Sequence, residues 1–284
     1  MTEVALALSS AVMFGFMTVA IVTGLRDLPD ASGATLATVL PAFAVTFVAA
    51  LVRHDPHGAW PFFLAGLLAP GVSQILFIHS IRLAGPSRAA ILIGVAPLVS
   101  AVLAIAFLGE PAQVGLVAGT VLIVAGGAFL AFEGKRPETF RALGVAAALL
   151  CAVMFGVRDN LVRHASSSYH PPPLLATAAT LLGACLFLVV YLLVAQRRQL
   201  RERFRSSLAP FLAAGLTLGF AYACLVEGFS HGRVTVVAPL NATQSIWGVV
   251  FAAVLVGRSE RIGPRTVFAG VLVVAGSALI SATR

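Results

Sequence analysis

Two charged residues stand side by side inside a long apolar stretch of the sequence. Arg158 and Asp159 follow the apolar run 142–157, and Arg163 comes four residues after the carboxylate. An acid four positions before a base is the favourable order for an ion pair on a helix, so Arg163 is one expected partner of Asp159. The alternative is that Arg158 faces a cavity and binds a substrate carboxylate, since a charge in an apolar segment is costly unless it is paired or used.

Two further titratable residues lie near the ends of apolar runs. The nearest following arginine to Glu227 is Arg233, six residues later, so no helical pairing with an arginine is expected and Glu227 is our candidate for a coupling proton. A carboxylate near a helix end could instead reach the membrane interface. His79 is similarly open to two interpretations, as a titrating group or as an interfacial residue bonded to the backbone.

Neutral polar residues recur at helical spacing. Asn241, Gln244 and Ser245 share one face of a helix, which would either line a watery cavity or bond a neighbouring helix. Tyr222 offers a ring and a hydroxyl, or packs in the core. The candidate substrate-binding residues are Phe14, Thr18, Gln74, His79, Arg158, Tyr222, Asn241, Gln244 and Ser245.

Prolines interrupt some of the apolar runs, and glycines in others allow close helix packing. Pro70 and Pro97 each remove a backbone donor, so they are candidate hinges, although a static kink fits the sequence equally well. Small residues predict close helix packing in two other runs. These residues are Gly115, Gly119 and Gly126 in the run 113–132, and Gly270, Val274 and Ser277 in the run 264–282.

The composition determines the class of protein that must hold these residues. Of 284 residues, 59% are hydrophobic and only 11% charged, and the mean hydropathy is +0.98. This composition excludes a soluble enzyme and a disordered chain, because too few charges exist to cover a surface in water. Three cysteines within apolar segments predict buried thiols, with no disulfide framework and no metal site.

Ten apolar runs are long enough to cross a membrane as helices, for which about 20 residues are needed. We therefore predict an all-α polytopic membrane protein. The first run continues to Leu25, too long for a signal peptide, and we expect it to be retained. The ten runs are residues 3–25, 34–52, 60–82, 87–108, 113–132, 142–164, 173–195, 208–230, 234–256 and 264–282.

The two halves of the chain repeat each other. The sequence Ala-Val-Met-Phe-Gly at 11–15 recurs 141 residues later at 152–156, and Val121–Gly126 is echoed at Val271–Gly276. Five helices form each half, and five is odd, so the second half would enter the membrane from the opposite side. We expect two inverted five-helix repeats at 1–132 and 142–284, with a linker at 133–141.

The ordered set of motifs resembles the EamA domain of the drug/metabolite transporter superfamily. The resemblance rests on Ala96-Pro97-Leu98-Val99, on Phe107-Leu108-Gly109-Glu110 and on the stretch from Gly119 to Gly126, and it covers nearly the whole chain. It implies a ten-helix transporter with a central cavity, and the YddG-type amino-acid exporters are the most similar functional group. The second half departs from the pattern, because the offset that matches Glu110 to Glu260 places Trp247 opposite Pro97.

The orientation in the membrane has two conflicting indications. The five loops that follow odd-numbered helices hold 14 of the 19 lysines and arginines, which favours a cytoplasmic position for those loops and an outward position for both termini. The family resemblance implies the reverse. We therefore attribute the net charge of +8 to the loops that set the orientation in the membrane, and we expect no nucleic-acid partner.

The function expected from the sequence is secondary transport. No nucleotide-binding loop is present, so an ion gradient or downhill flux would drive export of amino acids or related zwitterionic compounds across a bacterial-type cytoplasmic membrane. A lipid-carrier flippase or a multidrug exporter of the same superfamily is the alternative. We expect no enzyme activity and no cofactor, and a chain that works in the bilayer as a monomer or weak homodimer on a small-molecule substrate.

Overall fold

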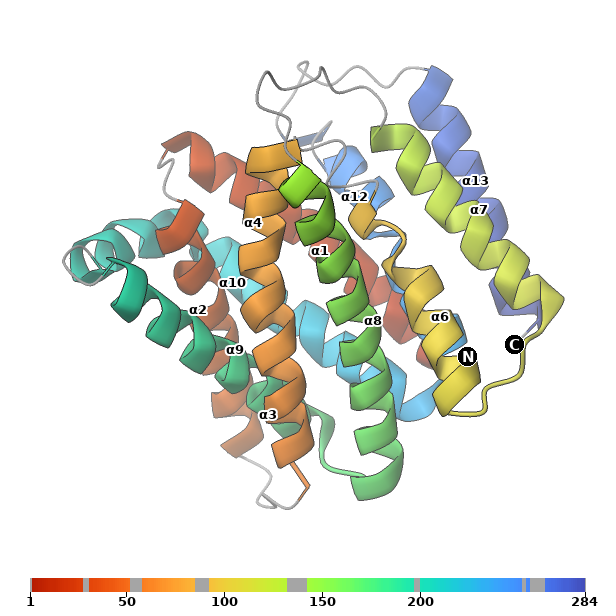
Figure 1. Cartoon of the computed structure of the whole chain (residues 1–284), viewed down its shortest axis with the longest axis horizontal. Helices are drawn as coiled ribbons and strands as arrows, with labels where there is room; N and C mark the ends of the chain where they lie inside the picture. Colours follow the sequence, from red (N-terminus) through yellow and green to blue (C-terminus); the bar gives the residue numbers. More distant parts are fainter. Residues whose placement is uncertain are drawn as a thin grey trace.

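Helices make up nearly all of the described part of the protein (Figure 1). A computed structural model describes residues 2–27, 31–51, 58–84, 92–131, 142–196, 200–251, 254–255 and 264–283, and none of these described residues forms a strand. Six helices among them are long and apolar enough to cross a membrane, and three shorter apolar helices cover 96–107, 114–129 and 268–283. A helix pairs its backbone groups within itself, which an apolar surrounding requires.

The helices follow the apolar runs closely. The first half contains α1 (Thr2–Asp27), α2 (Ala31–Leu51), α3 (Trp60–Gly66), the π-helical turn η1 (Leu67–Val72), α4 (Ser73–Ala84), α6 (Ala96–Phe107) and α7 (Val114–Ala131). The second half contains α8 (Ala142–Tyr169), α9 (Pro173–Gln196), α10 (Leu200–His231), α11 (Val234–Asn241), α12 (Gln244–Phe251) and α13 (Pro264–Thr283).

Two of the expected helices are interrupted. The run 60–82 leaves helical geometry at Ala69 (φ −146°, ψ 120°), directly before Pro70. The run 234–256 ends as α11 at Asn241 and resumes as α12 at Gln244, and the N–H of Thr243 between them bonds the carbonyl of Leu240, three residues earlier. Pro97 stands in the first turn of α6, just after a turn at 94–95. The interruption of the run 60–82 at Pro70 agrees with the sequence analysis, whereas the break in the run 234–256 was not predicted.

The repeated Ala-Val-Met-Phe-Gly sequence makes the same kind of contact in both halves. A Cβ on Gly15 would lie 2.5 Å from Cβ of Trp247 on α12, and a Cβ on Gly156 would lie 2.7 Å from Cγ1 of Val99 on α6. Each glycine thus allows its long helix to touch a helix of the other half, the one that follows the break in an apolar run.

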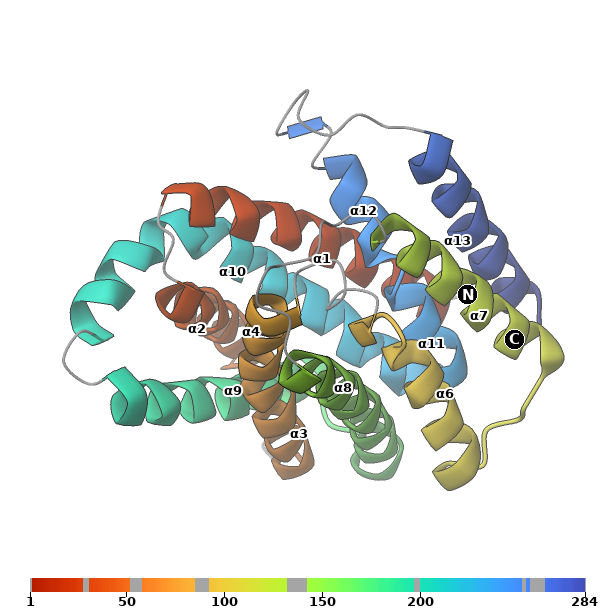
Figure 2. The ribbon, with the colours of Figure 1, turned by 45° about the horizontal axis from the view of Figure 1, so that its top comes forward.

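Hydrogen bonds repeat in the same way. Ser10 donates from α1 to the carbonyl of Ala221 on α10 (2.8 Å), and Cys151 donates from α8 to the carbonyl of Ser73 on α4 (3.4 Å). Figure 2 shows α10 beside α1, and α8 beside α3 and α4. The core is therefore built from helices of both halves.

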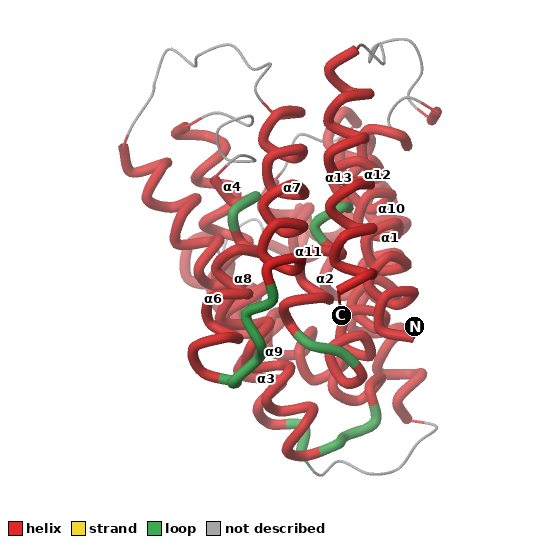
Figure 3. Tube along the Cα trace, turned by 90° about the vertical axis from the view of Figure 1, so that its right-hand side faces the viewer, coloured by secondary structure: helices red, strands yellow, loops and turns green. Residues whose placement is uncertain are grey.

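Helices α7 and α13 form a separate close pair, visible at one side of Figure 1 and again in Figure 3. A Cβ on Gly119 would lie 2.7 Å from the carbonyl of Gly276, and Gly115 and Gly126 are equally crowded by α13, as the sequence predicted. The prediction for α13 was wrong, because a Cβ on Gly270 would meet nothing within 4 Å and Val274 is 67% exposed.

Candidate functional site

A buried ion pair lies on α8. Arg158 and Asp159 are each 6% exposed, and Arg158 Nε is 2.9 Å from Asp159 Oδ1. The expected pairing of Asp159 with Arg163 was wrong. Arg163 Nη1 instead donates to the carbonyls of Phe229 (2.8 Å) and Ser230 (3.2 Å) in the last turn of α10. Carbonyls at the end of a helix lack partners within the helix, which explains why they attract this guanidinium.

Asp159 has a second partner on α6. Ser100 Oγ donates to Asp159 Oδ2 at 2.8 Å, and Asn160 Nδ2 donates to the carbonyls of Ser100 (3.0 Å) and Gly156 (2.9 Å). All of these side chains are buried. The sequence reasoning did not single out Ser100 or Asn160. The three consecutive polar residues 158–160 in an apolar helix could have drawn attention to Asn160, whereas the contact with Ser100 spans 59 positions and left no local signal.

Aromatic rings enclose the guanidinium of Arg158. Its Cζ lies 5.3 Å from the ring centroid of Tyr222 on α10 and 5.7 Å from that of Phe155 on α8. Phe14 on α1 meets Tyr222 edge to face, with centroids 5.5 Å apart. Both distances to the cation are within the range of cation–π attraction. Phe14 and Phe155 occupy the same position in the repeated five-residue sequence, so the two halves contribute equivalent rings.

Several polar atoms of this centre lack a hydrogen-bond partner among the described residues. They include Arg158 Nη1 and Asp159 Oδ1. Although Asp159 Oδ1 lies close to Arg158 Nε, the contact lacks hydrogen-bond geometry. Buried polar atoms are nearly always bonded in proteins, so such atoms mark a place where a further group can bind.

The remaining sequence-predicted residues do not join this centre. Thr18 is exposed and bonds the carbonyl of Phe14 in its own helix, and His79 is exposed with Nδ1 2.9 Å from the carbonyl of Ile75. Gln74 is partly exposed. In the described part of the chain, no hydrogen bond, ion pair or ring contact joins these three residues to Arg158.

The predicted stripe of Asn241, Gln244 and Ser245 is divided by the break between α11 and α12. Asn241 ends one helix and Gln244 begins the next, so helical spacing does not hold across the turn at 242–243. Ser245 is exposed and bonds the carbonyl of Ala242 at 3.3 Å. Within the described residues, no hydrogen bond or ion pair connects the stripe to Arg158.

Glu227 has a partner that the sequence reasoning overlooked. Its Oε1 lies 2.8 Å from Nε2 of His231, four residues further along α10, and the two side chains are 34% and 51% exposed. Helical spacing predicts this contact, and attention to arginine alone concealed it. Glu227 thus lies near one end of the helix bundle rather than beside Arg158.

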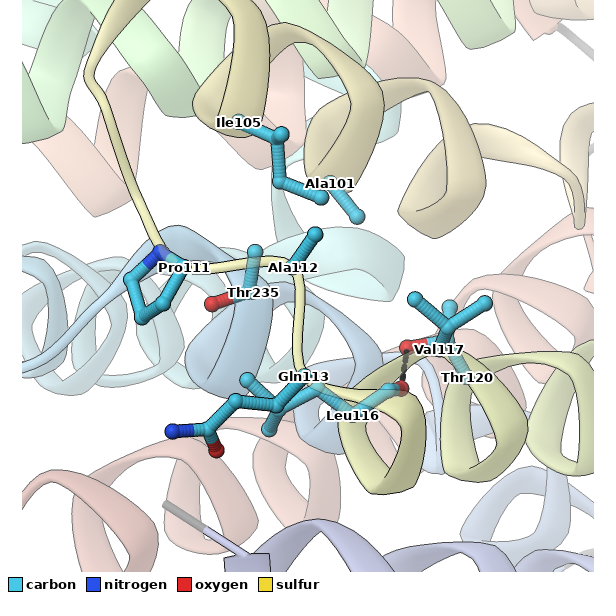
Figure 4. Close-up of a pocket in the computed structure, with 9 residues that line it drawn as sticks. All are labelled: Ala101, Ile105, Pro111, Ala112, Gln113, Leu116, Val117, Thr120 and Thr235. Atoms are coloured by element: carbon cyan, nitrogen blue, oxygen red, sulfur yellow. Dashed lines mark hydrogen bonds between the residues drawn. The ribbon is translucent and has the colours of Figure 1, made fainter.

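A small hollow lies between α6, the segment 111–113 and α7 (Figure 4). Its volume of about 10 Å³ has room for about one water molecule. The residues that line it are Ala101, Ile105, Pro111, Ala112, Gln113, Leu116, Val117, Thr120 and Thr235. No group of three or more potential metal ligands occurs among the residues that the structure describes.

Long apolar helices that enclose a buried ion pair are typical of an integral, multi-pass membrane protein. The chain belongs to the EamA-like transporter family, whose model matches residues 1–132 and 142–282. The resemblance to the drug/metabolite transporter superfamily is thereby confirmed, and the protein is a transporter of small molecules.

Solved structures agree with this assignment at the level of the fold. They include 29 chains that match significantly. One, described as "Crystal structure of protein", has a TM-score of 0.80 and 18% sequence identity, and covers 99% of this chain and 96% of its own. No curated protein matches significantly.

Proposed function

We propose that this protein is a secondary transporter that exports small zwitterionic metabolites, most simply amino acids, by alternating access. The proposed architecture is ten membrane-spanning segments in two inverted five-helix repeats, located in a bacterial-type cytoplasmic membrane. The matched contacts of Gly15 and Gly156 support this architecture, since both join a long helix to the part of an interrupted segment that follows its break.

The observation that carries the substrate class is the buried pair of Arg158 and Asp159. Isolated charges are expensive in a bilayer, and here a cation and an anion lie side by side with Arg158 Nη1 and Asp159 Oδ1 unbonded. A substrate with a carboxylate and an ammonium group complements both. The rings of Phe14 and Tyr222 would contact its apolar part.

The proposed movement uses the interruptions at Pro70, Pro97 and the turn at 242–243. Broken helices leave backbone groups unbonded near a binding site and allow one part of a helix to tilt without the other. Proton coupling is proposed at Glu227, which with His231 forms a pair able to accept a proton at one end of α10.

The test is transport by the purified full-length chain in proteoliposomes, with a panel of radiolabelled amino acids. We expect saturable flux of at least one neutral amino acid, and we expect Arg158→Met to abolish it while the variant remains folded by size-exclusion chromatography. The control is Arg233→Met, which removes an exposed arginine from the N-cap of α11 and should retain transport.

Two outcomes would overturn the proposed substrate class. Equal flux in the parent chain and the Arg158→Met variant would exclude the ion pair from the site. Flux of a lipophilic cation or of a labelled polyprenyl phosphate, with none of any amino acid, would favour the multidrug or lipid-carrier function instead.

A further inference from the structure

Glu110 binds the beginning of a helix in the other half of the chain. Its Oε1 accepts from the backbone N–H of Val234 at 2.8 Å, and its Oε2 accepts from the backbone N–H of Thr235 at 2.9 Å and from the Thr235 hydroxyl at 2.7 Å. The first N–H groups of a helix have no partner within it, and a carboxylate there also complements the helix dipole. One side chain therefore satisfies the N-terminus of α11.

The local sequence directs Glu110 to this position. Helix α6 ends at Phe107, and Gly109 takes a left-handed conformation (φ +66°) that turns the chain away from the helix axis. A Cβ on Gly109 would meet nothing within 4 Å, so the glycine is required by its backbone angle alone. The turn presents Glu110 across the boundary between α6 and α11.

Several elements meet at this end of the bundle. Gly232, two residues before Val234, packs against Glu3 in the first turn of α1, where an added Cβ would lie 2.6 Å from the Glu3 Cβ. The small hollow in Figure 4 is lined by Thr235 together with residues 111–113 that follow Glu110. Glu110 therefore connects the segment after α6 to α11 at the end of the bundle where α1, α6, α10 and α11 meet.

Helix α6 connects this end of the bundle to the buried ion pair. Ser100, in its second turn, holds Asp159, and Glu110, three residues beyond its end, holds α11. A tilt of α6 that released α11 would also displace the side chain that bonds Asp159. The two contacts lie near opposite ends of α6, so a rigid movement of this helix would affect both.

We propose that Glu110 is a latch that holds this end of the transporter closed, and that opening of this end breaks its bonds to Val234 and Thr235. The proposal rests on the alternating access proposed above. The latch is a carboxylate on one half that binds a helix N-terminus on the other, so release requires the two halves to separate here.

The test measures accessibility rather than transport. Val234 is fully buried (0% exposed), and its contribution to the latch is a backbone N–H that a Val234→Cys substitution retains. Membranes that contain the Val234→Cys variant are labelled with a maleimide. The labelling rate of the chain without this substitution, which has Cys151, Cys185 and Cys224, is subtracted. We expect Glu110→Ala to raise the rate at least about tenfold, because hydrogen bonds to a charged group are among the stronger ones.

Two milder variants make the result independent of any folding defect in Glu110→Ala. Thr235→Val removes only the hydroxyl bond and should raise the rate about twofold to fivefold. Gly109→Ala leaves Glu110 in place but disfavours the turn that presents it, and should also raise the rate. Membrane expression of each variant is measured in parallel.

The matched control is Glu202→Gln, which removes a carboxylate from the first turn of α10, at the opposite end of that helix from Val234, and should leave the labelling rate unchanged within about twofold. An increase in this control equal to that of Glu110→Ala would assign the effect to lost charge and overturn the latch. Unchanged labelling in Glu110→Ala, Thr235→Val and Gly109→Ala would overturn it as well. Since no substrate is used, failure of the proposed substrate class would leave this result intact.

Discussion

The guanidinium of Arg158 lies over the ring of Tyr222, with 5.3 Å between Cζ and the ring centroid. The two residues come from α8 and α10, and the ring also contacts Phe14 on α1. Tyr222 thus lies between a charged residue and a second aromatic ring.

Replacement of the ring should weaken substrate binding. Tyr222→Phe retains the face toward Arg158 and should keep transport near the parent level. Tyr222→Leu removes the cation–π attraction, worth about 0.5–2 kcal/mol, and should raise the apparent KM about twofold to 30-fold. Concentration-dependent flux in proteoliposomes measures both variants, and equal KM values in the two would show that the ring does not contribute.

Ser100→Ala should destabilise the protein. Loss of its hydroxyl leaves Asp159 Oδ2 buried without that donor, at a cost of about 1–3 kcal/mol. A lower melting temperature in detergent is the expected result. Ser245→Ala is the comparison, because Ser245 is exposed and bonds only its own helix region; a similar loss in both would show that the Asp159 contact contributes nothing particular.

Glycine substitutions should separate crowded from open positions. Gly156→Ala places a Cβ 2.7 Å from Val99 Cγ1 and should cost about 1–3 kcal/mol through overpacking. Gly270→Ala meets nothing within 4 Å inside α13 and should be neutral or stabilising by up to about 1 kcal/mol. Thermal unfolding of both variants measures the difference, and the reverse order would contradict the packing described for α8 and α6.

Pro97→Ala and Pro70→Ala should lower the maximal transport rate more than the apparent affinity. The reason is that neither proline is expected to touch substrate, whereas both lie at interruptions where a helix can bend. Kinetics of flux in proteoliposomes distinguish the two effects. An unchanged maximal rate in both variants would show that the prolines are static kinks and not hinges.

Glu227→Gln should abolish accumulation driven by a pH gradient and retain substrate exchange. Its side chain would no longer accept a proton beside His231. Vesicles with an imposed pH gradient measure accumulation, and counterflow without a gradient measures exchange. Full gradient-driven accumulation in this variant would favour facilitative export.

The helical class and the approximate segment positions could be predicted because apolar length and composition are properties of contiguous sequence. The close approach of α7 through Gly115, Gly119 and Gly126 could be predicted for the same reason. The partners of Asp159 could not, because Ser100 is distant in the chain and the choice between Arg158 and Arg163 depends on the open carbonyls at the end of α10. Glu110 stood out as part of a motif, but its partners lie 124 and 125 residues away.

The exchange of contacts between the two halves has a consequence for how the chain is made. Helix α1 packs against α10 and α12, and α2 packs against α9 and α10, so α1 and α2 find these neighbours only after the second half has entered the membrane. Until then the small residues that face those neighbours, such as Gly15, are exposed to lipid or to the insertion machinery. The first half therefore reaches its packed arrangement only after α9, α10 and α12 have been inserted beside it.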